Sequence, residues 1–485
     1  MNLVSLLLQP SAERPDAVAL VEGDRTVSFS ELEGLAAQGA GRLAALGIAP
    51  GDRVAIAAHN DIGFVTAYLA TLWAGAVAVP LNPLAPATVL SGQSARVGAK
   101  VLLFGAGVEL ADLDGATPIL ELEAGEPMPV EVERDDEELA VLLFTSGTAG
   151  APRAAMLTHG NLAANIGQVQ GHPGLAVRSE DVGLAALPFF HVFGLNVGLG
   201  VALQAGMTTV LLERFDAPRA AALIHRHAIT IVAGVPTMFG AFLELPETTA
   251  TPATFASVRL AVSGAAELPL DRAEAFLARF GITIYEGYGL TEAAPIVSTT
   301  AIEDAPRWGS IGPPLPGVEV RLVGDDGEDA LAGDPGEIWV RGQNVFVGYW
   351  DDPAATDLVL VDGWLRTGDV AVADDDGYLS LVDRKKDLVI VSGFNVFPAE
   401  VEDVLLTQPG IVDAAVIGVP NPRTGESVAA WVVLEPGGAV TADQVREFAA
   451  AHLARYKVPA TVEIVDALPR NEAGKLLRRE LRVLS

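Results

Sequence analysis

Cysteine is absent from the 485 residues of this chain. This absence excludes disulfide frameworks, thiolate zinc sites, iron–sulfur clusters and covalent catalysis through a cysteine of the protein. The hydrophobic fraction of 50% and the charged fraction of 19% are ordinary for globular proteins, so disorder is excluded as the main state. At roughly 150 residues per domain, a chain of this length predicts about three domains as a first estimate.

Basic residues are also few. Lysine and arginine together number 31 against 62 acidic residues, which gives a formal net charge of −31. Such a chain repels nucleic acids and anionic lipid surfaces, so we expect no nucleic-acid partner. Lysine is rarest, and four of the five lysines lie near the C-terminal end: Lys100, Lys385, Lys386, Lys457, Lys475. Either a compact point charge is needed at that end, or the distribution is accidental.

Hydrophobic runs long enough to suggest a membrane span are interrupted. The uncharged stretches 62–95 and 182–212 contain proline, glycine and polar residues, which is typical of buried elements in a large α/β core. Residues 1–9 are apolar, but no basic region precedes them and charged residues follow, so no targeting signal is predicted. We therefore expect a soluble, cytoplasmic protein without a transmembrane segment.

The pattern of apolar segments predicts an α/β fold. Apolar strand candidates without alternation, separated by helical segments, recur from residue 54 to 104 and from 141 to 285, which indicates doubly wound parallel sheets covered on both faces. The spacing of Ser30 and Glu33 predicts a capping box at the start of one helix. From about residue 308 to 382 helical patterns disappear, and short strands alternate with glycine and aspartate turns. We expect a large N-terminal domain (residues 1–382) with this β-rich portion, and a small α+β C-terminal domain (383–485).

A loop with phosphate-binding chemistry follows the strand at residues 141–144. It contains small hydroxyl residues and glycines and ends in a cation: Thr145, Ser146, Gly147, Thr148, Gly150, Arg153. Glycines let backbone N–H groups approach phosphate oxygens, hydroxyls add donors and the cation offsets negative charge. The spacing is not that of a Walker A loop, and a simple polar turn is the alternative.

This loop resembles the phosphate-binding signature of the adenylate-forming superfamily, which contains acyl- and aryl-CoA synthetases, luciferases and peptide-synthetase adenylation domains. Four further segments match the family's motifs in its order: 286–292, 362–369, 383–387 and 469–475. The stretch 286–482 looks most like bacterial long- and medium-chain fatty-acyl-CoA synthetases. The resemblance implies a ligase that uses ATP, Mg²⁺ and coenzyme A to activate a small-molecule carboxylic acid.

The resemblance also implies roles for individual residues in the ATP site. The loop from Thr145 to Arg153 would hold the β- and γ-phosphates, Thr291 the α-phosphate and Glu292 the Mg²⁺ ion, because Mg²⁺ prefers one or two carboxylates plus substrate phosphates. Tyr288 would lie against the adenine, and Asp369 would bind the ribose. The remaining nucleotide-site residues would be Gly264, Ala265, Glu286, Gly287, Gly289 and Arg384.

Further residues are implied for catalysis and acyl transfer. Lys475 would bridge the attacking carboxylate and the α-phosphate, since a compact ammonium helps two anions to meet. Asp383 would be the hinge about which the small domain turns, although it is also a plausible turn residue. Coenzyme A would reach the site along Ser392, Gly393 and Phe394.

The acyl pocket would include His191, Val235 and Ala266. His191 would gate this pocket or assist the thiol, and a core histidine is the alternative. The small or apolar residues near the pocket favour an uncharged aliphatic tail, and hence a fatty acid, over an amino acid.

Two positions depart from the family pattern. Ala149 and Arg153 stand where relatives commonly have threonine and lysine, which predicts a weaker interaction with ATP rather than none. Three alternatives to a fatty-acyl-CoA synthetase remain open: acyl transfer to a carrier protein's phosphopantetheine, an aryl-CoA ligase, and a catalytically silent nucleotide or acyl-adenylate binding protein.

Overall fold

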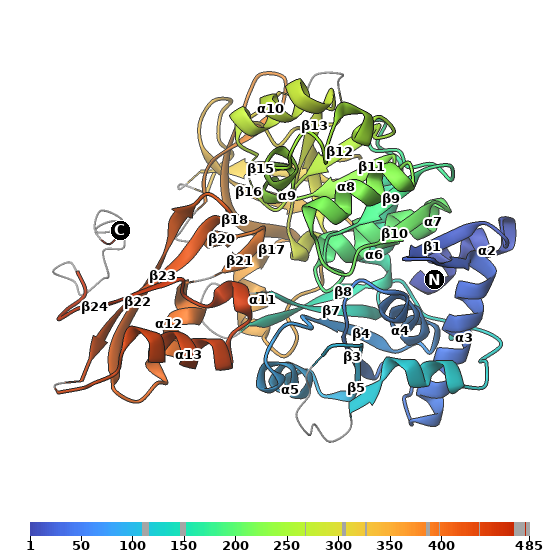
Figure 1. Ribbon diagram of the computed structural model, residues 1–485, viewed down its shortest axis with the longest axis horizontal. Helices are drawn as coiled ribbons and strands as arrows, with labels where there is room; N and C mark the ends of the chain where they lie inside the picture. The colour runs from blue at the N-terminus through green and yellow to red at the C-terminus, as the bar shows by residue number, and fades with distance from the viewer. Residues whose placement is uncertain are drawn as a thin grey trace.

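The chain folds into a large body and a smaller C-terminal one (Figure 1). The computed structural model describes residues 1–108, 116–145, 152–266, 268–302, 307–324, 327–384, 389–396, 398–435, 437–469 and 481. Helices and strands are mixed in both bodies. The α/β class predicted from the sequence, with a large N-terminal and a small C-terminal domain, is confirmed.

Two large sheets form the N-terminal body. One has the strand order β6(Ala116–Pro118), β5(Ala99–Phe104), β3(Arg53–Ala57), β4(Val77–Leu81), β7(Leu139–Thr145), β8(Arg153–Thr158). The other has the order β14(Ile296–Thr299), β13(Ile284–Gly289), β12(Leu260–Ser263), β11(Ile231–Gly234), β9(Val182–Ala185), β10(Thr208–Leu211), β1(Val18–Glu22), β2(Arg25–Ser28). Their central strands are parallel, and antiparallel strands β8, β2 and β14 close their edges.

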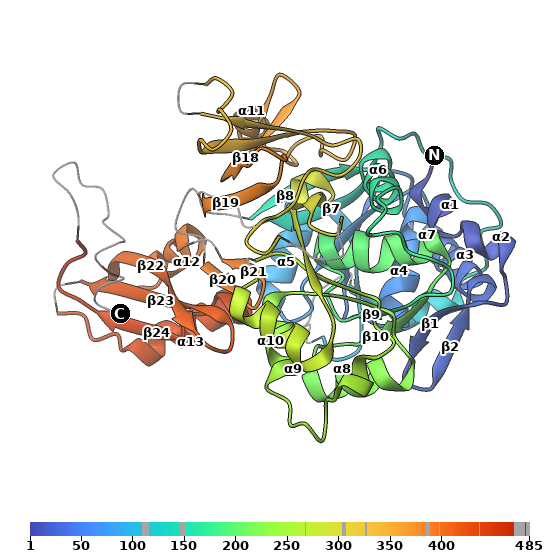
Figure 2. The ribbon, with the colours of Figure 1, turned by 90° about the horizontal axis from the view of Figure 1, so that it is seen from above.

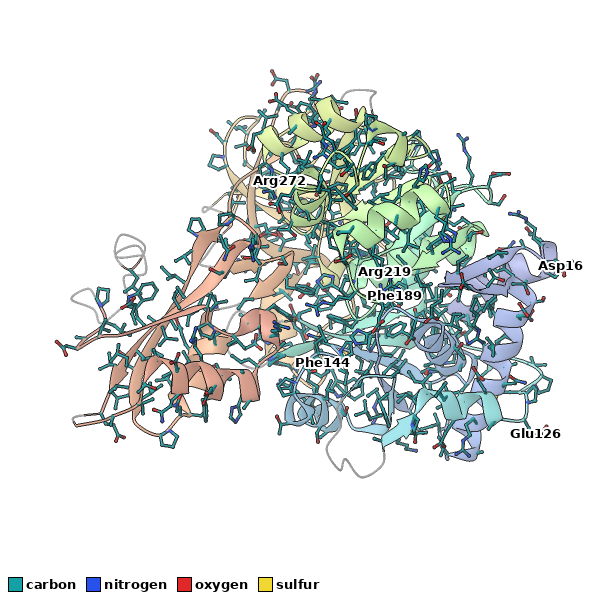
Figure 3. All side chains as sticks on the ribbon, in the orientation of Figure 1. Asp16, Glu126, Phe144, Phe189, Arg219 and Arg272 are labelled. Atoms are coloured by element: carbon teal, nitrogen blue, oxygen red, sulfur yellow. The ribbon has the colours of Figure 1, made fainter. Side chains whose placement is uncertain are left out.

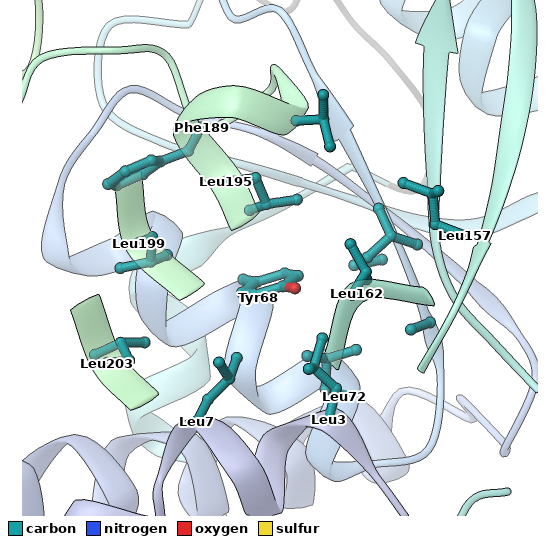
Figure 4. Close-up of a cluster of buried hydrophobic side chains, with 14 of the residues drawn as sticks. Leu3, Leu7, Tyr68, Leu72, Leu157, Leu162, Phe189, Leu195, Leu199 and Leu203 are labelled. Carbon is teal, nitrogen blue, oxygen red and sulfur yellow. The ribbon is translucent and has the colours of Figure 1, made fainter. Parts of the chain in front are cut away.

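Both sheets are buried on both faces, as their unbroken apolar strands predict. In β3, Val54 and Ile56 belong to the central core, whereas Ala55 and Ala57 belong to a separate core on the opposite face. The central core also contains strand residues of the second sheet, so it forms a layer between the sheets. Figure 4 shows part of this layer, with Tyr68 surrounded by leucines from several helices.

The helices of the large body pack between and around the sheets. They are α1(Leu3–Leu7), α2(Gln9–Glu13), α3(Phe29–Ala45), α4(Ile62–Trp73), α5(Ala87–Arg96), α6(His159–Gln170), α7(Ala202–Ala205), α8(Ala217–Arg226), α9(Pro236–Leu243) and α10(Leu270–Phe280), with a π-helix over Phe193–Val201. The capping box of α3 is formed by Ser28 and Glu31, so the predicted box at Ser30 and Glu33 is wrong by two residues. Both pairs have the same spacing, and the structure selects the one that precedes Phe29, which is buried.

A third sheet forms the β-rich portion. Its strands are β15(Glu319–Val323), β16(Gly336–Arg341), β17(Leu360–Val361), β18(Trp364–Ala373) and β19(Leu379–Arg384). Helix α11(Pro353–Val359) interrupts this region, so the prediction that helices disappear from 308 to 382 is wrong. Asp352 caps this helix and Pro353 is its first residue, a combination that signals a helix start.

The small body is a mixed sheet, antiparallel except for one parallel pair at its edge, with two helices on it (Figure 2). It comprises β20(Val389–Val391), β21(Phe394–Val396), α12(Pro398–Leu406), β22(Ile411–Asn421), β23(Gly425–Leu434), α13(Ala442–His452) and β24(Thr461–Ile464). β19 still pairs with β18 of the large body, whereas β20 pairs with β23, so the chain changes sheets between Arg384 and Val389.

Lys457, just before β24, makes a buried ion pair with Glu400 of α12, with Nζ 2.6 and 2.8 Å from the two carboxylate oxygens. Among the described helices, none combines the length and apolar character needed to cross a bilayer.

Candidate active site

The predicted phosphate loop joins two paired strands. β7 ends at Thr145 and β8 begins at Arg153, and these two residues are opposite one another in the antiparallel register. Phe144 of β7, labelled in Figure 3, lies near the junction with the small body. The loop residues Ser146, Gly147, Thr148, Ala149 and Gly150 lie outside the described residues.

Arg153 already has protein partners in this arrangement. Its Nε donates a hydrogen bond to Asp352 Oδ2 at 3.0 Å, and its guanidinium carbon lies 5.6 Å from the centre of the Tyr349 ring. The prediction that Arg153 reaches a phosphate therefore requires its planar head to turn from Asp352 or to contact the nucleotide from this position. Lysine has no planar head group and could not stack on the Tyr349 ring in this way. Arginine at position 153 therefore makes a ring contact that lysine would not make.

The segment predicted to bind the nucleotide continues from β13 into a short 3₁₀ turn, Thr291–Ala293. Glu286 is only 6% exposed, and its Oε2 accepts a hydrogen bond from Leu268 N–H, so it holds the chain just beyond Gly264–Ala266. Gly264 is close to Gly287 O, where an added Cβ would be 3.2 Å away. A Cβ on Gly289 would lie 2.2 Å from Pro295 O, so that position excludes any side chain. At Gly264 and Gly289 the backbone of a neighbouring segment therefore packs closely against the chain, and polar backbone atoms line this edge of β13.

Tyr288 and Asp369, which belong to different predicted motifs, are in contact. The Tyr288 hydroxyl donates to Asp369 Oδ2 at 2.7 Å, joining β13 to β18. In β18 the Asp369 N–H donates to Thr367 Oγ1, which fixes the local turn. The backbone of Arg384 is the register partner of Asp369 in β19. The structure thus places the predicted adenine and ribose residues side by side.

Glu292 is the predicted metal ligand, and its surroundings disfavour its negative charge. Burial raises the pKa of Glu292, and the nearby Asp369 carboxylate adds to this, whereas the hydrogen bond from Tyr349 and the charge of Arg153 oppose it. The Tyr349 hydroxyl donates to Glu292 Oε1 at 2.8 Å. A divalent cation would relieve the repulsion between the two carboxylates, and oxygen donors suit Mg²⁺, so the residues present fit that ion.

Sequence reasoning missed two residues of this cluster, Tyr349 and Asp352. Tyr349 has no motif of its own, and only the turn-like Gly348 before it draws attention to the position. Asp352 had a usable signal, since an aspartate directly before a proline is typical of a helix N-terminus. Its second carboxylate oxygen accepts the Ala355 N–H at 3.0 Å.

A cavity of about 650 Å³ lies between the large and the small body. It brings together six of the predicted residues for nucleotide, acyl and coenzyme A binding: His191, Val235, Ala265, Ser392, Gly393, Phe394. Ala266 does not line it, so its predicted place in the acyl pocket has no support from this cavity. Ser392 and Gly393 have positive φ angles of 52° and 84°, which makes the turn that carries Phe394 into the cavity wall.

Aromatic rings from both bodies meet in this wall. Phe394 stacks on Phe190 of the large body with ring centres 6.2 Å apart, and on Tyr456 of the small body with centres 4.4 Å apart. His191 meets the edge of Phe394 at 6.5 Å. These three rings and the imidazole form a continuous joint between the bodies.

His191 is uncharged in this cavity. Burial lowers the pKa of His191 to about 4. Within the described part of the chain, neither ring nitrogen has a hydrogen-bond partner. A neutral imidazole can accept a hydrogen bond from a thiol, which is what the predicted role in acyl transfer requires.

The remaining predicted site residues are Asp383, Arg384 and Lys475. Asp383 and Arg384 close β19, immediately before the change of sheet. Lys475 lies outside the described residues.

Comparison with known proteins identifies the family. A family model of AMP-binding enzymes matches residues 8–350, and the model of their C-terminal domain matches residues 400–475. The chain is 39% identical to a feruloyl-CoA synthase from Amycolatopsis over 96% of both proteins. It is 34% identical to a long-chain-fatty-acid–CoA ligase from Escherichia coli O157:H7, over 99% of this chain and 94% of that protein.

A solved structure agrees with both the fold and the use of coenzyme A. An o-succinylbenzoate CoA synthetase from Bacillus subtilis, bound with a CoA product analogue, superposes with a TM-score of 0.89 at 31% identity, covering 99% of this chain and 98% of that one. The resemblance to adenylate-forming enzymes, and with it the use of ATP and coenzyme A on a small-molecule acid, is confirmed. The chain belongs to the AMP-binding enzyme family and is an AMP-forming acid–CoA ligase.

Proposed function

We propose that this ligase activates a fatty acid, first forming acyl-AMP with release of pyrophosphate and then transferring the acyl group to coenzyme A with release of AMP. The observation that carries the proposal is the apolar wall of the cavity beside His191. Val235 precedes α9, and Met238 and Ala241 of that helix line the cavity together with Val235 and Phe193. Hydrocarbon surface of this kind gains free energy by covering an aliphatic chain. The relative that acts on long-chain fatty acids supports the same substrate class.

The nucleotide would bind at the polar edge of β13 and β18. We assign the ribose to Asp369, the adenine to Tyr288, the α-phosphate to Thr291, and the β- and γ-phosphates to the loop that begins at Thr145. Glu292 would hold Mg²⁺, whose positive charge would offset the repulsion between the acid and ATP. Lys475 would complete the site for adenylation.

The small domain is proposed to turn about Asp383, with residues 1–382 and 383–485 as the two moving parts. Ser392, Gly393 and Phe394 would border the pantetheine arm of coenzyme A. Arg214, Arg423 and Arg455 line the same cavity and are exposed, so they offer positive charge to the phosphates of coenzyme A in an otherwise acidic chain.

An aryl acid is the second candidate substrate. The feruloyl-CoA synthase is more similar in sequence than the fatty-acid ligase, at 39% against 34% identity. The ring stack of Phe190, Phe394 and Tyr456 would also suit an aromatic acyl group near the thiol. The difference between the candidates lies in the shape of the acid beyond its carboxylate.

A panel of acids tests the proposal. Pyrophosphate release and thioester formation would be measured with saturated acids from acetate to palmitate, and with benzoate, cinnamate and ferulate, using coenzyme A and a holo-acyl-carrier protein as acceptors. We expect the highest kcat/KM for an aliphatic acid with coenzyme A. A preference for ferulate or cinnamate would replace the fatty acid by an aryl acid, and a preference for the carrier protein would replace coenzyme A. ATP binding without pyrophosphate release from any acid would indicate a silent binding protein.

A further inference from the structure

We propose that Tyr349 is a positioning residue for adenylation: its hydroxyl fixes the carboxylate of Glu292 and thereby raises the affinity of the site for Mg²⁺-bound ATP. This inference rests on the proposed role of Glu292 as the metal ligand. It adds a residue that belongs to none of the five sequence motifs. The hydroxyl donates to Glu292 Oε1 at 2.8 Å, and this direction also determines where Oε2 lies.

Tyr349 is held rigidly enough for such a role. Its side chain is only 9% exposed, and the Phe346 ring meets it edge-on with ring centres 5.0 Å apart. Its backbone N–H donates to Thr356 Oγ1 at 2.9 Å, which ties it to helix α11. A hydrogen-bond donor on a fixed ring costs little further conformational entropy when the metal site forms.

The segment that carries Tyr349 is bound to both sides of the ATP site. Trp350 N–H donates to Ala154 O at 2.8 Å, so the segment follows β8 directly after the phosphate loop. Phe346 N–H donates to Glu292 O at 2.9 Å, which binds the same segment to the 3₁₀ turn of the metal ligand. Backbone hydrogen bonds therefore join this segment both to β8 and to the 3₁₀ turn. The Tyr349 hydroxyl adds a side-chain hydrogen bond to Glu292 of the same turn.

Arg153 also contacts the ring of Tyr349. Its guanidinium lies over the Tyr349 ring while its Nε is bound to Asp352. The positive charge at the end of the phosphate loop and the negative charge of the metal ligand are thus separated by one aromatic ring. Tyr349 thus contacts both the arginine that follows the phosphate loop and the proposed metal ligand.

A hydrogen bond that fixes a metal-binding carboxylate has an effect on metal affinity of known order of magnitude. Loss of such outer hydrogen bonds typically reduces metal affinity or activity by about 10–100-fold. A purely structural tyrosine would instead affect stability, and its loss would not be reversed by added Mg²⁺. The two roles therefore predict different responses to the ion.

The test is Tyr349→Phe, which keeps the ring and its packing and removes only the hydroxyl. We expect the concentration of free Mg²⁺ that gives half-maximal pyrophosphate exchange to rise about 10–100-fold, and the maximal rate to recover at high Mg²⁺. Independent of activity, calorimetry should show weaker binding of ATP in the presence of Mg²⁺ and unchanged binding of ATP in its absence. Mn²⁺ binding measured by electron paramagnetic resonance in the presence of ATP should weaken in parallel.

Tyr68→Phe is the matched control, because Tyr68 is 1% exposed and lies in the central core (Figure 4). It should leave the Mg²⁺ dependence unchanged. Glu292→Gln distinguishes a failure of the inference about Tyr349 from a failure of the proposed metal site. If Glu292→Gln abolishes the Mg²⁺ dependence while Tyr349→Phe leaves it intact, the inference about Tyr349 is wrong and the metal ligand stands. If Glu292→Gln itself leaves metal binding intact, the proposed metal site is wrong.

Discussion

Gly393 of the small domain lies directly against Val235 of the large domain. A Cβ built on Gly393 would be 2.6 Å from Val235 Cγ1, and the φ angle of Gly393 is +84°. Both features favour glycine, the first because of space and the second because side chains disfavour this backbone conformation. The contact also joins the predicted coenzyme A channel to the predicted acyl pocket.

Gly393→Ala should therefore impair thioester formation more than adenylation. We expect at least a tenfold loss in acyl transfer, since a clash of this kind costs more than about 1.4 kcal/mol, and little change in pyrophosphate exchange if the domains separate for that step. Rapid-quench measurement of the two half-reactions checks this. Gly437→Ala is the control, because Gly437 has φ +83° and no atom within 4 Å of its added Cβ. Equal losses in both half-reactions would contradict the predicted role of this joint.

Lys475→Ala should strongly slow the first half-reaction. Removing a charge that stabilises the transition state typically costs about 10²–10³-fold in rate, and we expect a loss of this size in acid-dependent pyrophosphate exchange. Thioester formation from a supplied acyl-adenylate should survive. Lys100→Ala, which removes an exposed lysine paired with Asp52 at 2.7 Å, should change neither reaction. Full exchange activity in the Lys475 variant would disprove its assignment.

Acyl transfer should show no titration of His191 between pH 6 and 8. Burial lowers the pKa of His191 to about 4, so the imidazole is already neutral throughout this range. The shape of the pH–rate profile should thus be the same in the wild type and in His191→Asn, even if the rate falls. An inflection near pH 6.5 that disappears in the variant would contradict the lowered pKa.

The ion pair between Lys457 and Glu400 should be important for the stability of the small domain. The two side chains are 11% and 9% exposed, and although burial alone would lower the pKa of Lys457, Tyr456 and Glu400 raise it. Lys457→Met leaves a buried carboxylate without its cation, which costs about 3–5 kcal/mol, whereas replacing both residues by apolar ones should restore much of the loss.

Hydrogen exchange of the amides in β22 and β23 measures this effect locally. Arg446→Met breaks an exposed pair with Asp443 and should cost less than about 1 kcal/mol. If the Lys457 and Arg446 variants lose equal protection, burial of the first pair has no special importance.

The sequence predicted the sheets of the large domain better than the contacts of the site. Unbroken apolar strands such as Val54–Ala57 are recognised because their burial on both faces leaves a clear local pattern. Tyr288 and Asp369 were each assigned to a motif, but their 2.7 Å contact depends on the packing of two sheets and has no local signal.

The errors in the sequence prediction have local causes. Ser28 and Ser30 both stand three residues before a glutamate, and only the tertiary burial of Phe29 decides which one caps the helix. Tyr349 was missed because its importance comes from Glu292, 57 residues away in sequence. Helix α11 was missed because the surrounding turns suggested only strands. Asp352 and Pro353 are nevertheless typical of a helix N-terminus and do begin this helix.

The stack of Phe190, Phe394 and Tyr456 limits how ligases of this kind can be recombined. Phe394 and Tyr456 belong to the small domain, and Phe190 belongs to the large one. A chimaera that received its small domain from a relative would bring a foreign pair of rings to Phe190. Position 190 would therefore have to be exchanged together with the transplanted segment for the joint to close.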